Sequence, residues 1–210
     1  SNAREKLKID INYSLRSHVL PVTPQKIFTV GDLFSPATVQ TLAPLEIFGS
    51  KIAALLSRKA PRDLYDVNNM LTNFPLSRTD MDMLRKNVIF YAAISSQGDN
   101  VPTTLSFDTI DSLSERDIRL QLRPVIRKGD PFALKEAREN TKEFLTFLLR
   151  EQVTERELEF LHAFRRNEYR PELLFDSRDV LDRISRHPMA LWKTHKKHEK
   201  FTAPPGDMRL

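Results

Sequence analysis

The sequence of 210 residues contains no cysteine, so a disulfide framework and thiolate chemistry are excluded. The absence fits a reducing compartment, and we expect a cytoplasmic protein. No apolar run approaches the length of a membrane span and no secretory signal is visible, so no membrane association is expected. The sequence also lacks a Gly-rich phosphate loop, a GxSxG element and an HExxH motif, which leaves three large enzyme classes without support.

Positive charge is what the sequence does have, and it is concentrated in one place. Residues 183–200 hold six basic residues against Glu199, which equals the net charge of +5 for the whole chain. Such a run can attract phosphate backbones, but we expect an ordinary solvated end with His187 on the surface. Trp192, beside Met189 and Leu191, is expected to pack in the core.

The pattern before residue 44 predicts strands. Residues 7–13, LKIDINY, alternate apolar and polar side chains, as a strand with one buried face does. The runs 26–30 and 38–42 predict two further short strands separated by turn residues. Three strands make only part of a sheet, and an uncovered edge invites pairing between chains, so we expect a homodimer.

After residue 44 the apolar spacing becomes helical. Helices are predicted over 44–59, 61–73, 79–95, 114–127, 131–150, 154–167, 176–186 and 187–197, with a polar loop over 96–112. Pro61 suits the first turn of the second helix. Thr154 with Glu157 has the pattern of a capping box, and Asp130 before Pro131 is typical of a helix start.

The same patterns predict the domain organisation. Residues 1–3, Ser-Asn-Ala, are typical of the remnant of a cleaved expression tag and are left out of the fold. The change from strands to helices near residue 75 predicts one domain over 4–75 and a helical domain over 76–210. The predicted fold class is α+β, a partial sheet with helices followed by an all-helical domain.

Two sites could carry chemistry, and the first is Asp10 in the middle of the first predicted strand. A strand can hold a carboxylate rigidly for a metal ion, as two-metal phosphoryl-transfer sites require. The alternative is an exposed strand face, or an ion pair with a cross-strand lysine or arginine.

The second is the stretch KIAALLSRKAPRDLYDV, a dense charge cluster around one proline. Lys51, Arg58 and Arg62 are spaced by seven and four, so an unbroken helix would place them on one face, where they could hold a phosphate or carboxylate. Asp63 lies in the first turn after the proline, where free amides favour a carboxylate. Asp66 follows Arg62 by four residues, and an ordinary surface ion pair explains that spacing too.

The stretches KIDINYSLR (8–16) and LAPLEIFGSKIAALLSRKAPRDLYDV (42–67) resemble the AbiEii/AbiGii nucleotidyltransferase toxin family. The later stretches FYAAIS, LRPVIRKG, FRRNEYRPELLF and HPMALWK resemble a subgroup of it, so the likeness spans nearly the whole chain. The resemblance implies a mixed sheet flanked by helices, followed by a helical C-terminal domain. It also implies transfer of a nucleotide from an NTP, with Mg²⁺, to tRNA, another RNA or a protein, and a cognate antitoxin as partner.

The resemblance also implies roles for particular residues. Asp10 matches the third acidic residue of the metal site, and Lys51 matches a lysine that contacts the triphosphate. Asp63 and Asp66 match the final acidic motif, which serves active-site assembly or catalysis. Glu46, Arg58 and Arg62 match positions that frame this motif. Arg58 and Arg62 are, with Lys51, the candidate substrate-binding cations.

One family element is not found in these 210 residues: the Gly-Gly or Gly-Ser turn followed by a D-x-D strand that holds the principal metal carboxylates. We therefore expect this chain to represent the C-terminal portion of such an enzyme and to be inactive alone. Two alternatives stay open: a non-catalytic helical module that recognises an antitoxin or RNA, and an unrelated helical protein with a salt-bridged surface. Only the enzyme hypothesis predicts that Asp10, Lys51 and Asp66 converge on one cleft.

Overall fold

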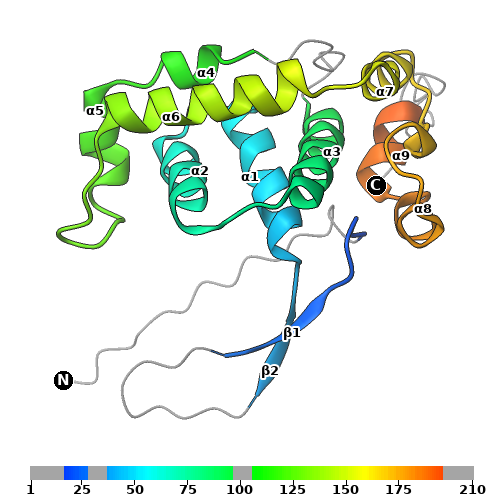
Figure 1. Cartoon of the computed structure of the whole chain (residues 1–210), viewed down its shortest axis with the longest axis horizontal. Helices are drawn as coiled ribbons and strands as arrows, with labels where there is room; N and C mark the ends of the chain where they lie inside the picture. The colour runs from blue at the N-terminus through cyan, green and yellow to red at the C-terminus, as the bar shows by residue number, and fades with distance from the viewer. Residues whose placement is uncertain (1–16, 28–36, 97–105, 196–210) are drawn as a thin grey trace, which may run out of the picture.

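The structure is a computed structural model that describes residues 17–27, 37–96 and 106–195 (Figure 1). The elements follow in the order β1 (Thr23–Lys26), β2 (Thr38–Thr41), α1 (Pro44–Ser57), α2 (Pro61–Asn73), α3 (Arg78–Ser95), α4 (Asp108–Asp111), α5 (Glu115–Asp117), the π-helical η1 (Ile118–Leu122), α6 (Leu134–Thr146), the π-helical η2 (Phe147–Glu151), α7 (Glu155–Arg165), the 3-10 turn η3 (Pro171–Leu173), α8 (Arg178–Ile184) and α9 (Pro188–His195). A small sheet beside many helices confirms the α+β class.

The strands β1 and β2 form an antiparallel hairpin that extends away from the helices (Figure 1). β2 confirms the strand predicted over 38–42. β1 begins before the strand predicted over 26–30, because Thr23 pairs with Thr41, and residues 28–30 of that prediction lie outside the described residues. The strand predicted over 7–13 lies outside the described residues, so the mixed sheet and the dimer through its edge stay predictions.

The helices pack around two connected apolar clusters, and α3 contributes to both. The first cluster joins α1, α2, α3 and α6; the second joins α3 to α7, α8 and α9. Figure 1 shows α3 between these two groups, with α5 and α9 at opposite ends of the body. The first cluster crosses residue 75, so apolar packing does not separate the helices on either side of it. The two predicted domains stay a prediction based on the sequence pattern.

A buried ion pair fastens the second group of helices to α3. Arg85 Nε donates to both carboxylate oxygens of Glu157 at 3.0 Å, and both side chains are almost fully buried. Glu157 Oε2 also accepts from the backbone amide of Thr154 at 2.8 Å, so the predicted capping box of α7 is confirmed. One carboxylate therefore starts α7 and attaches it to α3. Removing Arg85 would leave the buried Glu157 carboxylate without its charged partner, whereas Arg85 also pairs with Asp82.

Most predicted helices are confirmed, and the exceptions have local causes. The helix predicted from 131 begins only at Leu134, because the Asp130 carboxylate accepts from the Tyr65 hydroxyl at 2.9 Å instead of capping a helix. The helix predicted over 114–127 is confirmed as far as η1. The loop predicted over 96–112 contains α4, which the sequence pattern missed.

His187 and Trp192 are the two clear errors near the C-terminal end. His187 is fully buried, whereas Trp192 is 51% exposed. The buried side chains His187, Ala190 and Thr194 follow helical spacing towards α3, and Trp192 lies off that stripe. The His187 ring meets Phe90 edge-on at 5.4 Å between centroids. Burial lowers the pKa of His187 to about 4, so the ring is neutral near pH 7.

The tightest helix contact is the crossing of α1 and α3 at Gly49. A Cβ at this position would lie 2.5 Å from Asn87 Cβ, well inside van der Waals contact. Gly49→Ala should therefore lower the free energy of unfolding by about 1–3 kcal/mol, because one of the helices must shift. Urea titration followed by circular dichroism measures this. Ser50→Ala, on a half-buried neighbour whose hydroxyl bonds only to Ile47 of its own helix, should change it by less than about 0.5 kcal/mol. Equal losses would contradict the assigned close contact.

Candidate functional site

The charge cluster lies at the joint between α1 and α2. α1 ends at Ser57, Ala60 is extended with φ −129° and ψ 111°, and Pro61 opens α2. Proline disfavours a helical conformation in the preceding residue, and its missing N–H is harmless in a first turn. The chain therefore changes direction inside the cluster. The single basic face that an unbroken helix would give to Arg58 and Arg62 does not form.

Arg58 and Asp63 form one of the ion pairs at this joint, where Lys59 also pairs with Asp117 of α5 at 2.9 Å. Arg58 Nε donates to Asp63 Oδ2 at 2.7 Å and its Nη2 donates to Oδ1 at 3.0 Å, a bidentate contact. The hydrogen bond to Asp63 raises the pKa of Arg58 above its usual range. Asp63 is 1% exposed, so its carboxylate is committed to this partner. The pair fixes the angle between the helices, and the expected catalytic and substrate-binding roles of the two residues stay predictions.

Lys51 and Asp66 form another ion pair, across the two helices. Lys51 Nζ lies 2.6 Å from Asp66 Oδ2, and the side chains are 39% and 32% exposed. Arg62 and Asp66, the alternative partners, do not form an ion pair within the part of the chain that the structure describes. The structure therefore brings Lys51 and Asp66 together as a pair that is partly open to solvent. Their expected convergence with Asp10 stays a prediction, because Asp10 lies outside the described residues.

A pocket of about 460 Å³ lies beside this ion pair, between α1 and α2. Its apolar wall includes Phe48 and Phe74, whose rings meet edge-on with centroids 5.0 Å apart. Asn69 and Asn73 add amide groups, which sequence reasoning missed. The signal was present, because these residues continue the helical spacing from Asp66. An apolar cleft with a few polar groups and one cation suits a small anionic ligand with a flat apolar part.

A second pocket, of about 410 Å³, lies on the other side of Asp66. It is formed by α2 and the turn before α6, and it is lined by Arg62, Tyr65, Asp66, Val125, Ile126, Arg127 and Asp130. The Tyr65 hydroxyl donates to Asp130 and thereby holds the turn against α2. Asp66 is thus shared by two pockets, one with Lys51 and one with Arg62 and Arg127. The sequence pattern gave no sign of the turn's contribution, because the contact joins residues 65 positions apart.

Glu46 lines neither pocket, but its hydrogen bonds hold the start of α1 in place. Its carboxylate is fully buried in the first turn of α1 and accepts from the backbone amides of Val19 at 2.8 Å and Leu20 at 2.9 Å. The Tyr91 hydroxyl of α3 donates to the same carboxylate. Burial, together with the Glu46 charge, raises the pKa of Tyr91 well above its usual range. Glu46 therefore fixes α1, and with it Lys51, against its neighbours.

The described residues do not fit a magnesium site. No three His, Asp or Glu side chains come together in the part of the chain that the structure describes. Asp10, the expected metal ligand, lies outside those residues. The one D-x-D pair of the sequence, Asp80 and Asp82, lies on the first turn of α3. Asp80 caps that helix with Ser77, and Asp82 pairs with basic neighbours on α3.

The two arginines of the cluster give a matched test of the joint. Arg58→Ala should lower the free energy of unfolding by about 1–3 kcal/mol, because it leaves the buried Asp63 carboxylate without its charged partner. Arg62→Ala removes an exposed side chain and should change stability by less than about 0.5 kcal/mol. Urea titrations of both variants measure the difference. Similar losses for the two would contradict the structural role assigned to Arg58.

Comparison with known proteins bears on what this arrangement does. No curated protein and no solved structure gives a significant match. None of the helices in the described ranges is long and apolar enough to cross a membrane. The family model described as "Nucleotidyl transferase AbiEii toxin, Type IV TA system" matches residues 1–167, which is most of the sequence. The chain therefore belongs to the AbiEii nucleotidyl transferase family of type IV toxin–antitoxin systems.

Proposed function

We propose that α1 and α2 form one wall of the nucleotide site of an AbiEii-type nucleotidyltransferase that transfers a nucleotide from an NTP to an RNA or protein acceptor. The observation that carries the proposal is the solvent-accessible Lys51–Asp66 pair beside a pocket in a chain of this family. Membership in a toxin–antitoxin family also implies an antitoxin partner. The acceptor, the nucleotide and the antitoxin belong to the proposal.

In this proposal Lys51 binds the triphosphate. The Asp66 carboxylate holds the Lys51 ammonium group in place at 2.6 Å, so little ordering remains when a phosphate arrives. A triphosphate carries more negative charge than the Asp66 carboxylate and would take up part of the Lys51 interaction. Phe48 and Phe74 offer an apolar wall to the base, and Asn69 offers an amide for its polar edge. Asp66 then faces the reacting phosphates from the far side of Lys51.

The structure supports binding better than it supports chemistry. Nucleotidyl transfer with two metal ions needs carboxylates that converge on the attacking and leaving oxygens. In the described part of the chain no such set exists, and the carboxylates of Asp63, Asp80 and Asp82 are committed to other partners. We therefore place no step of the mechanism on a metal ion bound to these residues. The expected inactivity of the chain alone follows as part of the proposal.

NTP binding can be tested at the residue level. Titration of ¹⁵N-labelled protein with each NTP should shift the amide signals of Lys51, Asn69 and Asn73. The Lys51→Met variant should bind the NTP about tenfold more weakly or worse, because a charged contact is lost. Lys142→Met is the matched control, since Lys142 has similar exposure, 37%, and an ion pair with Asp111 at 2.8 Å. Shifts confined to other helices, or equal weakening in both variants, would overturn the assignment of the pocket.

Catalysis is tested separately. Incubation of the protein with each α-³²P-labelled NTP, Mg²⁺ and bulk tRNA should leave both the RNA and the protein unlabelled, because the described carboxylates do not form a metal site. Gel autoradiography measures the product. Label that appears with the unaltered chain and disappears in Asp66→Asn would contradict the expected inactivity and would give Asp66 a direct catalytic role.

A further inference from the structure

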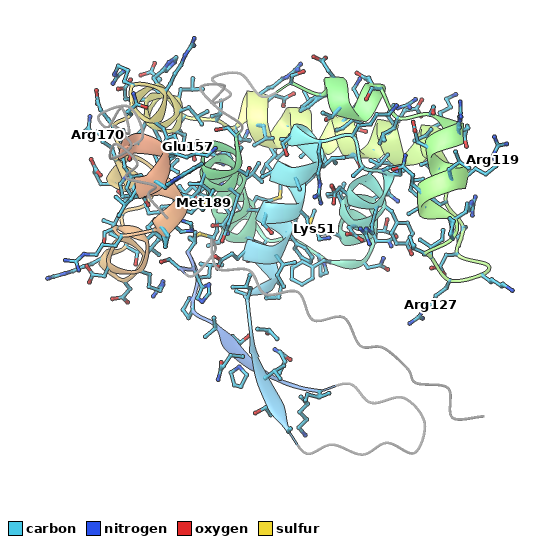
Figure 2. All side chains as sticks on the ribbon, turned by 180° about the vertical axis from the view of Figure 1, so that it is seen from behind. Lys51, Arg119, Arg127, Glu157, Arg170 and Met189 are labelled. Atoms are coloured by element: carbon cyan, nitrogen blue, oxygen red, sulfur yellow. The ribbon has the colours of Figure 1, made fainter. Side chains whose placement is uncertain are left out.

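A ridge of basic side chains lies beside the second pocket. It is formed by five exposed residues of α5, η1 and the turn that follows them: Arg116, Arg119, Arg123, Arg127 and Lys128. Figure 2 shows the labelled Arg119 and Arg127 projecting outward at one end of the molecule, away from Arg170 at the other end. The family-based expectations assign no role to these residues.

Most of the ridge has no carboxylate partner within the described residues. Arg123 donates to the carbonyl oxygens of Asp130 and Phe132. Two nearby acidic side chains are already used, because Asp130 accepts from Tyr65, and Asp117 is bound by Ser114 and by Lys59 at 2.9 Å. Glu115, the exposed neighbour of Arg116, forms no ion pair within the described residues. The hydrogen bond from Ser114, with that from Lys59, lowers the pKa of Asp117 to about 2, so this carboxylate is fully committed.

The opposite end of the molecule shows a different arrangement. There Arg156, Arg166 and Arg170 each form an ion pair with an acidic side chain at 2.6–3.2 Å. At that end Arg165 and Arg186 are exposed without such pairs, whereas on the ridge four basic residues without ion pairs follow one another along α5, η1 and the turn: Arg116, Arg119, Arg127 and Lys128. Adjacent like charges repel one another, so an unneutralised row favours an anionic partner with repeating charges.

The ridge leads to the candidate nucleotide site. Arg127 lines the second pocket together with Arg62, and that pocket shares Asp66 with the pocket of Lys51. A polyanion bound along the ridge would therefore reach Asp66 from the second pocket, on the side opposite to the proposed NTP. An acceptor in a nucleotidyl transfer must approach from that side.

We propose that the ridge binds the phosphate backbone of an RNA whose end enters the second pocket. That this end acts as the acceptor of the nucleotide rests on the proposed function. Repeated arginines match repeated phosphates, and phosphate contacts supply most of the affinity in such complexes. A protein partner would favour an aromatic or apolar centre with a polar rim. The exposed large hydrophobic residues on the ridge are Leu120 and Val125.

The test is fluorescence anisotropy with a fluorescein-labelled RNA hairpin that has a single-stranded 3′ end, at several salt concentrations. The double variant Arg119→Gln with Arg127→Gln should weaken binding about tenfold near 0.1 M salt and reduce the slope of log K against log salt by about 1–2. The matched control is Arg165→Gln with Arg186→Gln, which removes two exposed arginines at the other end of the body. It should leave both quantities nearly unchanged.

Three results would overturn the proposal. They are no RNA binding by the unaltered chain, an equal loss in the two double variants, and displacement of the RNA by poly-L-glutamate at equal charge concentration, which would favour an acidic protein as occupant. The NTP titration separates this proposal from the function proposed above. The ridge variant should keep its NTP shifts, whereas Lys51→Met should lose NTP binding and keep RNA binding.

Discussion

The carboxylate of Glu46 is the interaction on which the position of the site depends. It is fully buried, and it is stabilised by two backbone amides and a tyrosine hydroxyl rather than by a cation. A buried carboxylate is costly unless it is fully hydrogen-bonded, so these donors must stay in place. The result joins the segment before β1, the start of α1 and the middle of α3. Arg183 of α8 adds a second link by donating to the carbonyl oxygen of Val19.

From this fixed start, α1 directs Lys51 towards α2, and the joint at Pro61 determines what Lys51 meets. Two ion pairs within the charge cluster differ in exposure. Asp63 is buried with Arg58, which suits a structural contact, whereas Lys51 and Asp66 are each about one-third exposed beside a pocket. Pairs of this second kind contribute little to stability, because solvent screens them. Both groups therefore stay accessible to a ligand, which is the basis of the proposed nucleotide site.

Local patterns predicted the helices well, because a 3.6-residue apolar period and a proline at a helix start act within a few residues. They failed where tertiary contacts decide. The Asp130 carboxylate accepts a hydrogen bond from Tyr65 instead of capping a helix. The orientation of α9 buries His187 and exposes Trp192. In the site, Lys51 and Asp66 lie together, whereas the convergence with Asp10 that the family resemblance implies stays a prediction. Neither pattern nor resemblance showed the second pocket, because it depends on a turn that only folding brings to α2.

The helix α2 relates the two pockets to one another. Arg62, Asp66, Asn69 and Asn73 follow a spacing of four, three and four residues, which places them along one face of the helix. The first lines one pocket, the last two line the other, and Asp66 lines both. Two ligands bound along this face would meet at Asp66, one held by Lys51 and the other by Arg62 and Arg127. A donor and an acceptor aligned along one rigid helix need only small movements to react, which is the geometry that group transfer requires.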